Sequence, residues 1–155
     1  MQRAERSIRV AAPADRVYQF WRNFENLPQF MEHVQEVQSL DADHRLSHWQ
    51  LKGPLGMTLE YDAEVVEDIP NKSIGWRSRE GGDVGVSGNV TFTELDNNET
   101  QVHVVMQWFD PPAGPIGEAL SRMLQNPERM LEEDLHRFKK VIESNTGSQR
   151  EARVA

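Results

Sequence analysis

The 155-residue sequence contains no cysteine. This absence excludes disulfides, thiolate nucleophiles, zinc–thiolate sites and iron–sulfur clusters, and it suits a chain that stays in a reducing compartment. Long hydrophobic runs are also missing, since even Val104-Val105-Met106 is far too short to cross a bilayer. The residues that follow Met1 include no apolar segment of the signal-peptide kind. We therefore expect a cytoplasmic protein with no secretory signal and no transmembrane segment.

Basic residues are scarce in the middle of the chain. Residues 25–114 carry five basic against sixteen acidic side chains, whereas the net charge of the whole chain is −8. Proteins that bind nucleic acid place a basic face against the phosphates, and this long acidic stretch would repel them. We therefore expect no nucleic-acid partner.

Motifs for metals, cofactors and nucleophiles are missing as well. The five histidines lie in no HExxH or nucleophile-elbow pattern. Residues 81–85 are glycine-rich but open no helix, so they lack the helix N-terminus that a phosphate cradle needs. We expect no metal and no cofactor, and the pattern assigns no catalytic residue.

The sequence does contain a clear succession of periodic segments. Alternation predicts a strand over 7–11, and an apolar stripe at helical spacing predicts a short helix from Pro13 to Phe24, followed by a second, shorter helix or turn. From residue 34 onward the apolar period is two, and turn residues separate the strands at hairpin spacing. The strands expected in this antiparallel meander are 34–40, 45–51, 58–68, 73–78, 86–95 and 101–109.

A long C-terminal helix follows the strands. Apolar residues from Ile116 to Ile142 recur at spacings of three and four or of multiples of these. Asn126-Pro127 either kinks this helix or begins a second one with Asn126 as its cap. The residues expected to face the sheet are Leu120, Met123, Leu131, Leu135 and Phe138.

These elements predict one α+β domain. A chain of this length forms a single core, which we assign to residues 1–145, and residues 146–155 show no core pattern and are expected to be disordered. The apolar face of a curved seven-stranded antiparallel sheet must be buried, and the C-terminal helix is the element large enough to cover it. We expect a cavity between the sheet and this helix.

Six short motifs point to a known family. They are residues 12–18 (APADRVY), 24–31 (FENLPQFM), 53–56 (GPLG), 76–78 (WRS), 88–92 (GNVTF) and 133–139 (EDLHRFK). Through them the sequence resembles the START-like helix-grip superfamily, also called SRPBCC, and in particular its polyketide cyclase/dehydrase and lipid-transport branch. The resemblance covers about residues 5–143 and implies the helix-grip fold. Because only some members are enzymes, it says less about function.

Aromatic and methionine side chains form the candidate ligand site. Large rings from several strands, together with adaptable methionines, are typical of an apolar pocket. With the resemblance, they predict a cavity of about 300–1,000 Å³ between sheet and helix, with an entrance near residues 53–56 and 81–85. The expected lining is Trp49, Tyr61, Trp76, Phe92, Met106, Trp108, Leu120 and Met123.

Polar residues on the strands support other interpretations. The register leaves open which face of the sheet His48, His103 and Arg77 occupy. The acidic residues of the strand at 58–68 indicate a solvated strand face rather than a paired-carboxylate site. These residues are Glu60, Asp62, Glu64, Glu67 and Asp68.

Three classes of function fit this pattern. The first is a carrier or sensor that binds a small hydrophobic molecule, such as a lipid, a quinone or a polyketide-like compound. The second is a polyketide cyclase/aromatase or dehydratase acting in the same cavity, which would need a buried titratable group such as His48 or His103 near its substrate. The third is a protein-interaction module. The pattern determines neither the ligand nor the oligomeric state.

Overall fold

Strands and helices follow one another in nearly the order that the sequence predicts. The computed structural model describes residues 2–109, 111 and 113–154. Its strands are β1 (Gln2–Val10), β2 (Val34–Ser39), β3 (Leu46–Lys52), β4 (Thr58–Ile69), β5 (Ser73–Ser78), β6 (Val86–Glu94) and β7 (Thr100–Trp108). Its helices are α1 (Ala14–Arg22), α2 (Pro115–Met123) and α3 (Pro127–Val154), and short 3-10 helices are η1 (Phe24–Gln29), η2 (Pro54–Gly56) and η3 (Asp96–Asn98).

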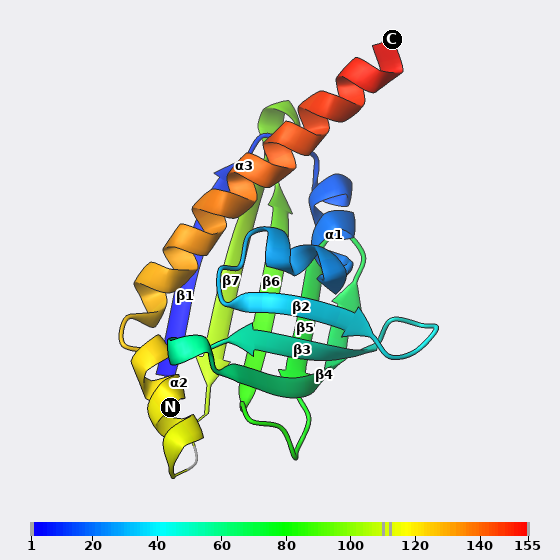
Figure 1. The fold of residues 1–155 in the computed structure, drawn as a ribbon. Coiled ribbons are helices and arrows are strands. Elements are labelled where there is room, and N and C mark those ends of the chain that lie inside the picture. The colour runs from blue at the N-terminus through cyan, green and yellow to red at the C-terminus, as the bar shows by residue number, and fades with distance from the viewer. Residues whose placement is uncertain (1, 110, 112, 155) are drawn as a thin grey trace.

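The seven strands form one antiparallel sheet in the order β1-β7-β6-β5-β4-β3-β2 (Figure 1). Strands β2 to β7 each pair with the next, which confirms the predicted meander. Strand β1 pairs with β7 from Gln2, opposite Trp108, to Val10, opposite Thr100. It begins earlier than the predicted strand at 7–11, because pairing with β7 gives its first residues hydrogen-bond partners that side-chain alternation does not reveal.

The sheet has one apolar and one polar face, as the alternation predicts. In β4, Leu59, Tyr61 and Ala63 are buried, while Glu60 and Glu64 lie on the opposite side. Helix α3 packs along β1, and α1 packs on β6. A curved antiparallel sheet closed on a long helix is the helix-grip arrangement that the resemblance implies.

A bulge in β4 reverses part of this pattern. The pairing with β5 shifts after Val65, and the extra residue, Val66, is exposed. Asp68 therefore pairs with the buried Ile74 and turns to the concave face, where the Nε of Arg22 donates a hydrogen bond to it at 3.0 Å. The prediction that Asp68 belongs to the solvated acidic face is wrong, because simple alternation contains no sign of an inserted residue.

The C-terminal helix is interrupted where the sequence predicts. The side-chain oxygen of Asn126 accepts a hydrogen bond from the backbone N–H of Arg129 at 3.2 Å, and Pro127 is the first residue of α3. Asn126 thus caps a second helix rather than kinking one. The residues expected to face the sheet are buried, with Met123 partly so: Leu120, Met123, Leu131, Leu135 and Phe138.

Helix α3 continues through most of the segment expected to be disordered. It runs to Val154, and in Figure 1 this end of α3 projects beyond the sheet. Residues 146–154 contain one glycine and no proline, so no residue forces the helix to end there. Residue 155 lies outside the described residues, and the division into a domain of residues 1–145 and a tail stays a prediction.

Candidate functional site

An apolar cavity lies between the concave face of the sheet and the junction of α2 with α3. Its volume is about 70 Å³. Six of the eight residues proposed from the sequence line it, and they come from three strands and one helix. They are Trp49, Tyr61, Met106, Trp108, Leu120 and Met123.

The cavity is far smaller than the sequence predicts, and the expectation of about 300–1,000 Å³ is wrong for this structure. Aromatic packing takes up the remaining space. Trp49 stacks on Tyr61 with ring centroids 5.5 Å apart and on Trp76 at 6.4 Å, and Phe24 packs edge-on against Trp49 at 5.7 Å. The abundance of rings is visible in the sequence, but the closeness of their packing is not.

One side of the expected entrance adjoins the cavity. A surface groove of about 490 Å³ is lined in part by Gly53 and Pro54 and shares His33 and Met123 with the cavity. From the second expected rim, at residues 81–85, Val84 contributes to the cavity wall itself. Met123 therefore stands between the groove and the interior.

Trp76 and Phe92 are buried but do not line this cavity. Trp76 lies against Gly88, where an added Cβ would come within 2.3 Å of the indole ring. Phe92 packs edge-on against Tyr18, with ring centroids 6.1 Å apart. It is six residues along β6 from the cavity-lining Val86, which corresponds to roughly 20 Å of strand. Alternation predicted the face of these residues correctly but not their position along the strand.

Two polar side chains, Asp134 and His33, interrupt the apolar wall. Asp134 is only 8% exposed; it accepts a hydrogen bond from the backbone N–H of Glu32 at 3.2 Å and another from the Arg137 guanidinium. Burial raises the pKa of the Asp134 carboxyl, although both hydrogen bonds oppose that shift. No pattern in the sequence marked Asp134 as a site residue, although it stands three positions after Leu131 in the apolar stripe of α3.

The polar residues whose orientation was open all lie on the outer face. His48 contacts Asp62 at 2.6 Å through Nδ1, and the Nε of Arg77 donates to Glu64 at 3.1 Å. His103 contacts Glu5 at 2.6 Å through Nε2. His48 and His103 are therefore not the buried titratable groups that catalysis in the cavity would need.

The described part of the chain has no group of three or more His, Asp or Glu side chains placed to hold a metal ion. Within the same residues, no helix is both long enough and apolar enough to span a bilayer.

Sequence comparison decides the family. The profile described as "Polyketide cyclase / dehydrase and lipid transport" matches residues 10–136. This chain belongs to that family. An uncharacterized 17.2 kDa protein from the melC2-rnhH intergenic region of Streptomyces lincolnensis is 36% identical over 143 residues, which are 92% of this chain and 91% of the relative.

Solved structures agree with this assignment of the fold. A protein from Deinococcus radiodurans shares 30% identity with a TM-score of 0.73, covering 94% of this chain and 99% of that one. The Zhui aromatase/cyclase from Streptomyces sp. R1128 aligns at 18% identity and TM-score 0.67 over 93% of this chain and 92% of its own. A START superfamily protein from Mycobacterium smegmatis aligns at 18% identity and TM-score 0.65 over 92% and 97%. The last two similarities concern the fold alone.

The polyketide cyclase/dehydrase and lipid transport family includes both catalysis and transport on one fold. Membership in the family therefore does not show which of these two activities a given member has. In this family member the choice depends on the chemistry of the cavity wall. That wall is largely apolar, with one carboxyl group at Asp134 and one imidazole at His33.

Proposed function

We propose that this protein binds a small hydrophobic molecule, of the lipid, quinone or polyketide-like kind, in the apolar cavity and acts as its carrier or sensor. The observation that supports the proposal is the composition of the wall. Trp49, Tyr61 and Trp108 supply large rings, and four methionines supply side chains that change shape easily. The methionines are Met31, Met106, Met123 and Met130.

The ligand would enter by displacing methionine side chains. A cavity of about 70 Å³ is smaller than the molecules proposed, so the wall has to yield. Met123 lines both the cavity and the groove beside Gly53, and a new rotamer of its unbranched side chain would join the two spaces. Binding then fills the groove and cavity together.

Catalysis as a polyketide cyclase/aromatase or dehydratase is the second candidate, and Asp134 favours it. A buried carboxyl group with a raised pKa retains its proton to a higher pH and so suits general acid chemistry. Tyr61 also lines the cavity, and its hydroxyl has no hydrogen-bond partner among the described residues. These two groups could orient or protonate a carbonyl oxygen of a ligand.

Blocking the cavity tests the carrier proposal. Met123→Trp adds volume where groove and cavity meet, so it should abolish the fluorescence enhancement of an added hydrophobic probe such as anilinonaphthalene sulfonate while preserving the thermal unfolding midpoint. Ile69→Trp, at an exposed position outside the cavity, is the matched control and should bind like the wild type. A wild-type protein that never binds the probe, or a Met123→Trp variant that unfolds, would indicate a solid interior.

Mass spectrometry separates the carrier from the enzyme. The protein is incubated with cell extract, washed, and its bound compounds are identified. A compound that is released unchanged supports the carrier. A compound that the wild type converts and the Asp134→Asn variant only binds supports the cyclase or dehydratase.

A further inference from the structure

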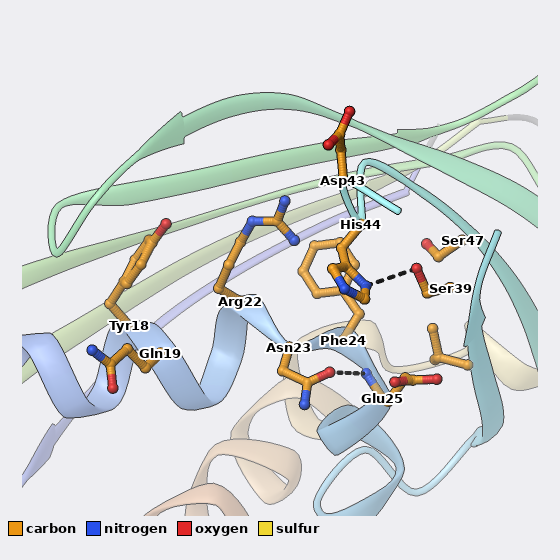
Figure 2. Close-up of a pocket in the computed structure, with 11 residues that line it drawn as sticks. Tyr18, Gln19, Arg22, Asn23, Phe24, Glu25, Ser39, Asp43, His44 and Ser47 are labelled. Carbon is orange, nitrogen blue, oxygen red and sulfur yellow. Dashed lines mark hydrogen bonds between the residues drawn. The ribbon is translucent and has the colours of Figure 1, made fainter. Parts of the chain in front are cut away.

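A second pocket lies between α1 with η1 and the β2–β3 hairpin (Figure 2). Its volume is about 440 Å³, which is within the range of about 300–1,000 Å³ usual for small-molecule sites. It shares no lining residue with the apolar cavity. No function described so far uses it.

Arg22 presents the two terminal nitrogens of its guanidinium group to this pocket. The side chain is only 16% exposed, and its Nε donates to Asp68 at 3.0 Å. The Tyr18 hydroxyl donates to the other oxygen of Asp68, so the carboxylate is held from two sides. The two terminal nitrogens of Arg22 have no hydrogen-bond partner among the described residues. A largely buried guanidinium group that is held at its Nε and has two free terminal nitrogens is well suited to bind an acceptor oxygen on a ligand.

His44 offers an acceptor to the same pocket. The Ser39 hydroxyl donates to the carbonyl oxygen of Asp41 at 3.1 Å and lies 2.8 Å from the Nδ1 of His44 (Figure 2). The tautomer of His44 that fits this arrangement carries its proton on Nδ1 and donates it to the hydroxyl. In the neutral ring this leaves Nε2 without a proton. Nε2 has no partner among the described residues, so it is free to accept a hydrogen bond from a ligand hydroxyl.

Phe24 and Val37 give the pocket an apolar surface. The Cζ of Arg22 lies 5.7 Å from the centroid of the Phe24 ring, so the guanidinium group and the ring form one continuous surface. A flat aromatic ligand could stack beside Phe24 while its substituents reach Arg22 and His44.

The charges around the pocket favour a neutral ligand. Burial opposes the charge of Asp68, but the Tyr18 hydroxyl and Arg22 outweigh it and lower the pKa of the carboxyl, so Asp68 stays ionised and balances Arg22. Burial and the bond to Asp68 raise the pKa of Tyr18 to about 12, so Tyr18 remains a donor. Glu25 and Asp43 add two further acidic side chains to the lining. A carboxylate ligand would meet more negative than positive charge.

We propose that this pocket is a second binding site, separate from the apolar cavity, for a neutral aromatic compound that carries a carbonyl oxygen for Arg22 and a hydroxyl group for His44. The proposal does not depend on the function assigned to the apolar cavity.

Five probe compounds test this ligand class by amide NMR titration near neutral pH. 4-Hydroxyacetophenone and its 3-hydroxy isomer carry both groups, 4-methoxyacetophenone lacks the hydroxyl donor, 4-ethylphenol lacks the carbonyl, and 4-hydroxybenzoate adds a negative charge. The better of the two hydroxyacetophenone isomers should bind about tenfold more tightly than each of the other three compounds, because each of those loses one hydrogen bond or gains a charge repulsion. The shifted amides should centre on residues 22–25 and 39–47.

Two variants assign the two contacts. Arg22→Lys keeps the charge but removes the planar guanidinium group. It should therefore weaken the binding of the hydroxyacetophenone by about tenfold and leave the binding of 4-ethylphenol unchanged. His44 has a φ of 57°, which asparagine tolerates, so His44→Asn should keep the hairpin and abolish the preference for the hydroxy over the methoxy compound. Arg16→Gln removes a positive charge from the same helix outside the pocket and should bind like the wild type.

Other results overturn the proposal. If 4-hydroxybenzoate binds as tightly as the hydroxyacetophenones, the pocket is an anion site. If the shifts centre on residues 120–124 or disappear in Met123→Trp, the compounds occupy the apolar cavity. Absence of binding at millimolar concentration, or equal binding by wild type and Arg22→Lys, also contradicts it.

Discussion

His48 lies on the outer face of β3 between two carboxylates, with Nδ1 2.6 Å from Asp62 and Nε2 3.3 Å from Glu60. The hydrogen bond to Asp62 raises the pKa of His48 above its ordinary value of 6.5; burial opposes this shift and Glu60 adds to it. An NMR titration of the imidazole should therefore have its midpoint above 6.5, and Asp62→Asn should lower it. A wild-type midpoint at or below 6.5 would contradict the observed pairing.

The same contact makes a small contribution to stability. Because the pKa of His48 is raised in the folded state, its stabilisation is fully present below the pKa of the unfolded chain and is lost as the pH rises through the folded pKa. For an ion pair at the protein surface this amounts to less than about 1 kcal/mol.

Asp134 should destabilise the fold once its carboxyl group ionises. Burial raises the pKa of its carboxyl above the ordinary value of 3.8, so the fold favours the protonated form. As the pH rises from 3.8 through the folded pKa, this residue therefore costs stability, and Asp134→Asn should remove that cost. Urea unfolding of both proteins between pH 4 and 7 measures the difference in their free energies of unfolding. This difference should grow in favour of the variant as the pH rises. A difference that is independent of pH would show that Asp134 is ionised equally in the folded and unfolded chains.

At the scale of elements, α1 packs on the core with one face and lines the second pocket with another. Val17 and Trp21 are fully buried against the core. Tyr18 and Arg22, four residues apart and thus neighbours on the helix surface, both bond to Asp68 beside the second pocket. The bulge in β4 supplies the third member of this network by turning Asp68 inward. Helix and strand therefore position Arg22 in the second pocket together.

Helix α3 should contribute much of the stability of the fold. Leu135 is 2% exposed and belongs to the core, so Leu135→Ala should lower the free energy of unfolding by about 2–5 kcal/mol. Glu132→Ala, at an exposed position on the same helix, is the control and should change it by less than about 0.5 kcal/mol. Chemical denaturation measures both. A loss for Leu135→Ala as small as that of the control would mean that another face of α3 supports the sheet.

At the scale of the whole molecule, negative charge dominates the surface. The net charge is −8, and the outer face of the sheet carries Glu60, Asp62 and Glu64 beside one another on β4. This field should repel phosphates, so micromolar protein should give no shift with duplex or single-stranded nucleic acid in fluorescence anisotropy. A shift that weakens as salt is added would overturn the prediction.

The sequence by itself determined the elements and the faces they present. The period-two pattern predicted the buried face of Tyr61 and of Trp108, and the period of three and four predicted the stripe through Leu135. Asn126 and Pro127 predicted the break between α2 and α3. These features follow from local geometry, because side chains two apart on a strand or three to four apart on a helix necessarily share a face.

Only the tertiary structure decided what those faces enclose. Position along a strand separates Phe92 from the cavity, although it shares the concave face with Tyr61. The bulge after Val65 brings Asp68 to Arg22, and strand register places His48 outside. Volume was the least predictable quantity, because it depends on how rings from different elements interlock. Such contacts join residues far apart in the chain, and no local period records them.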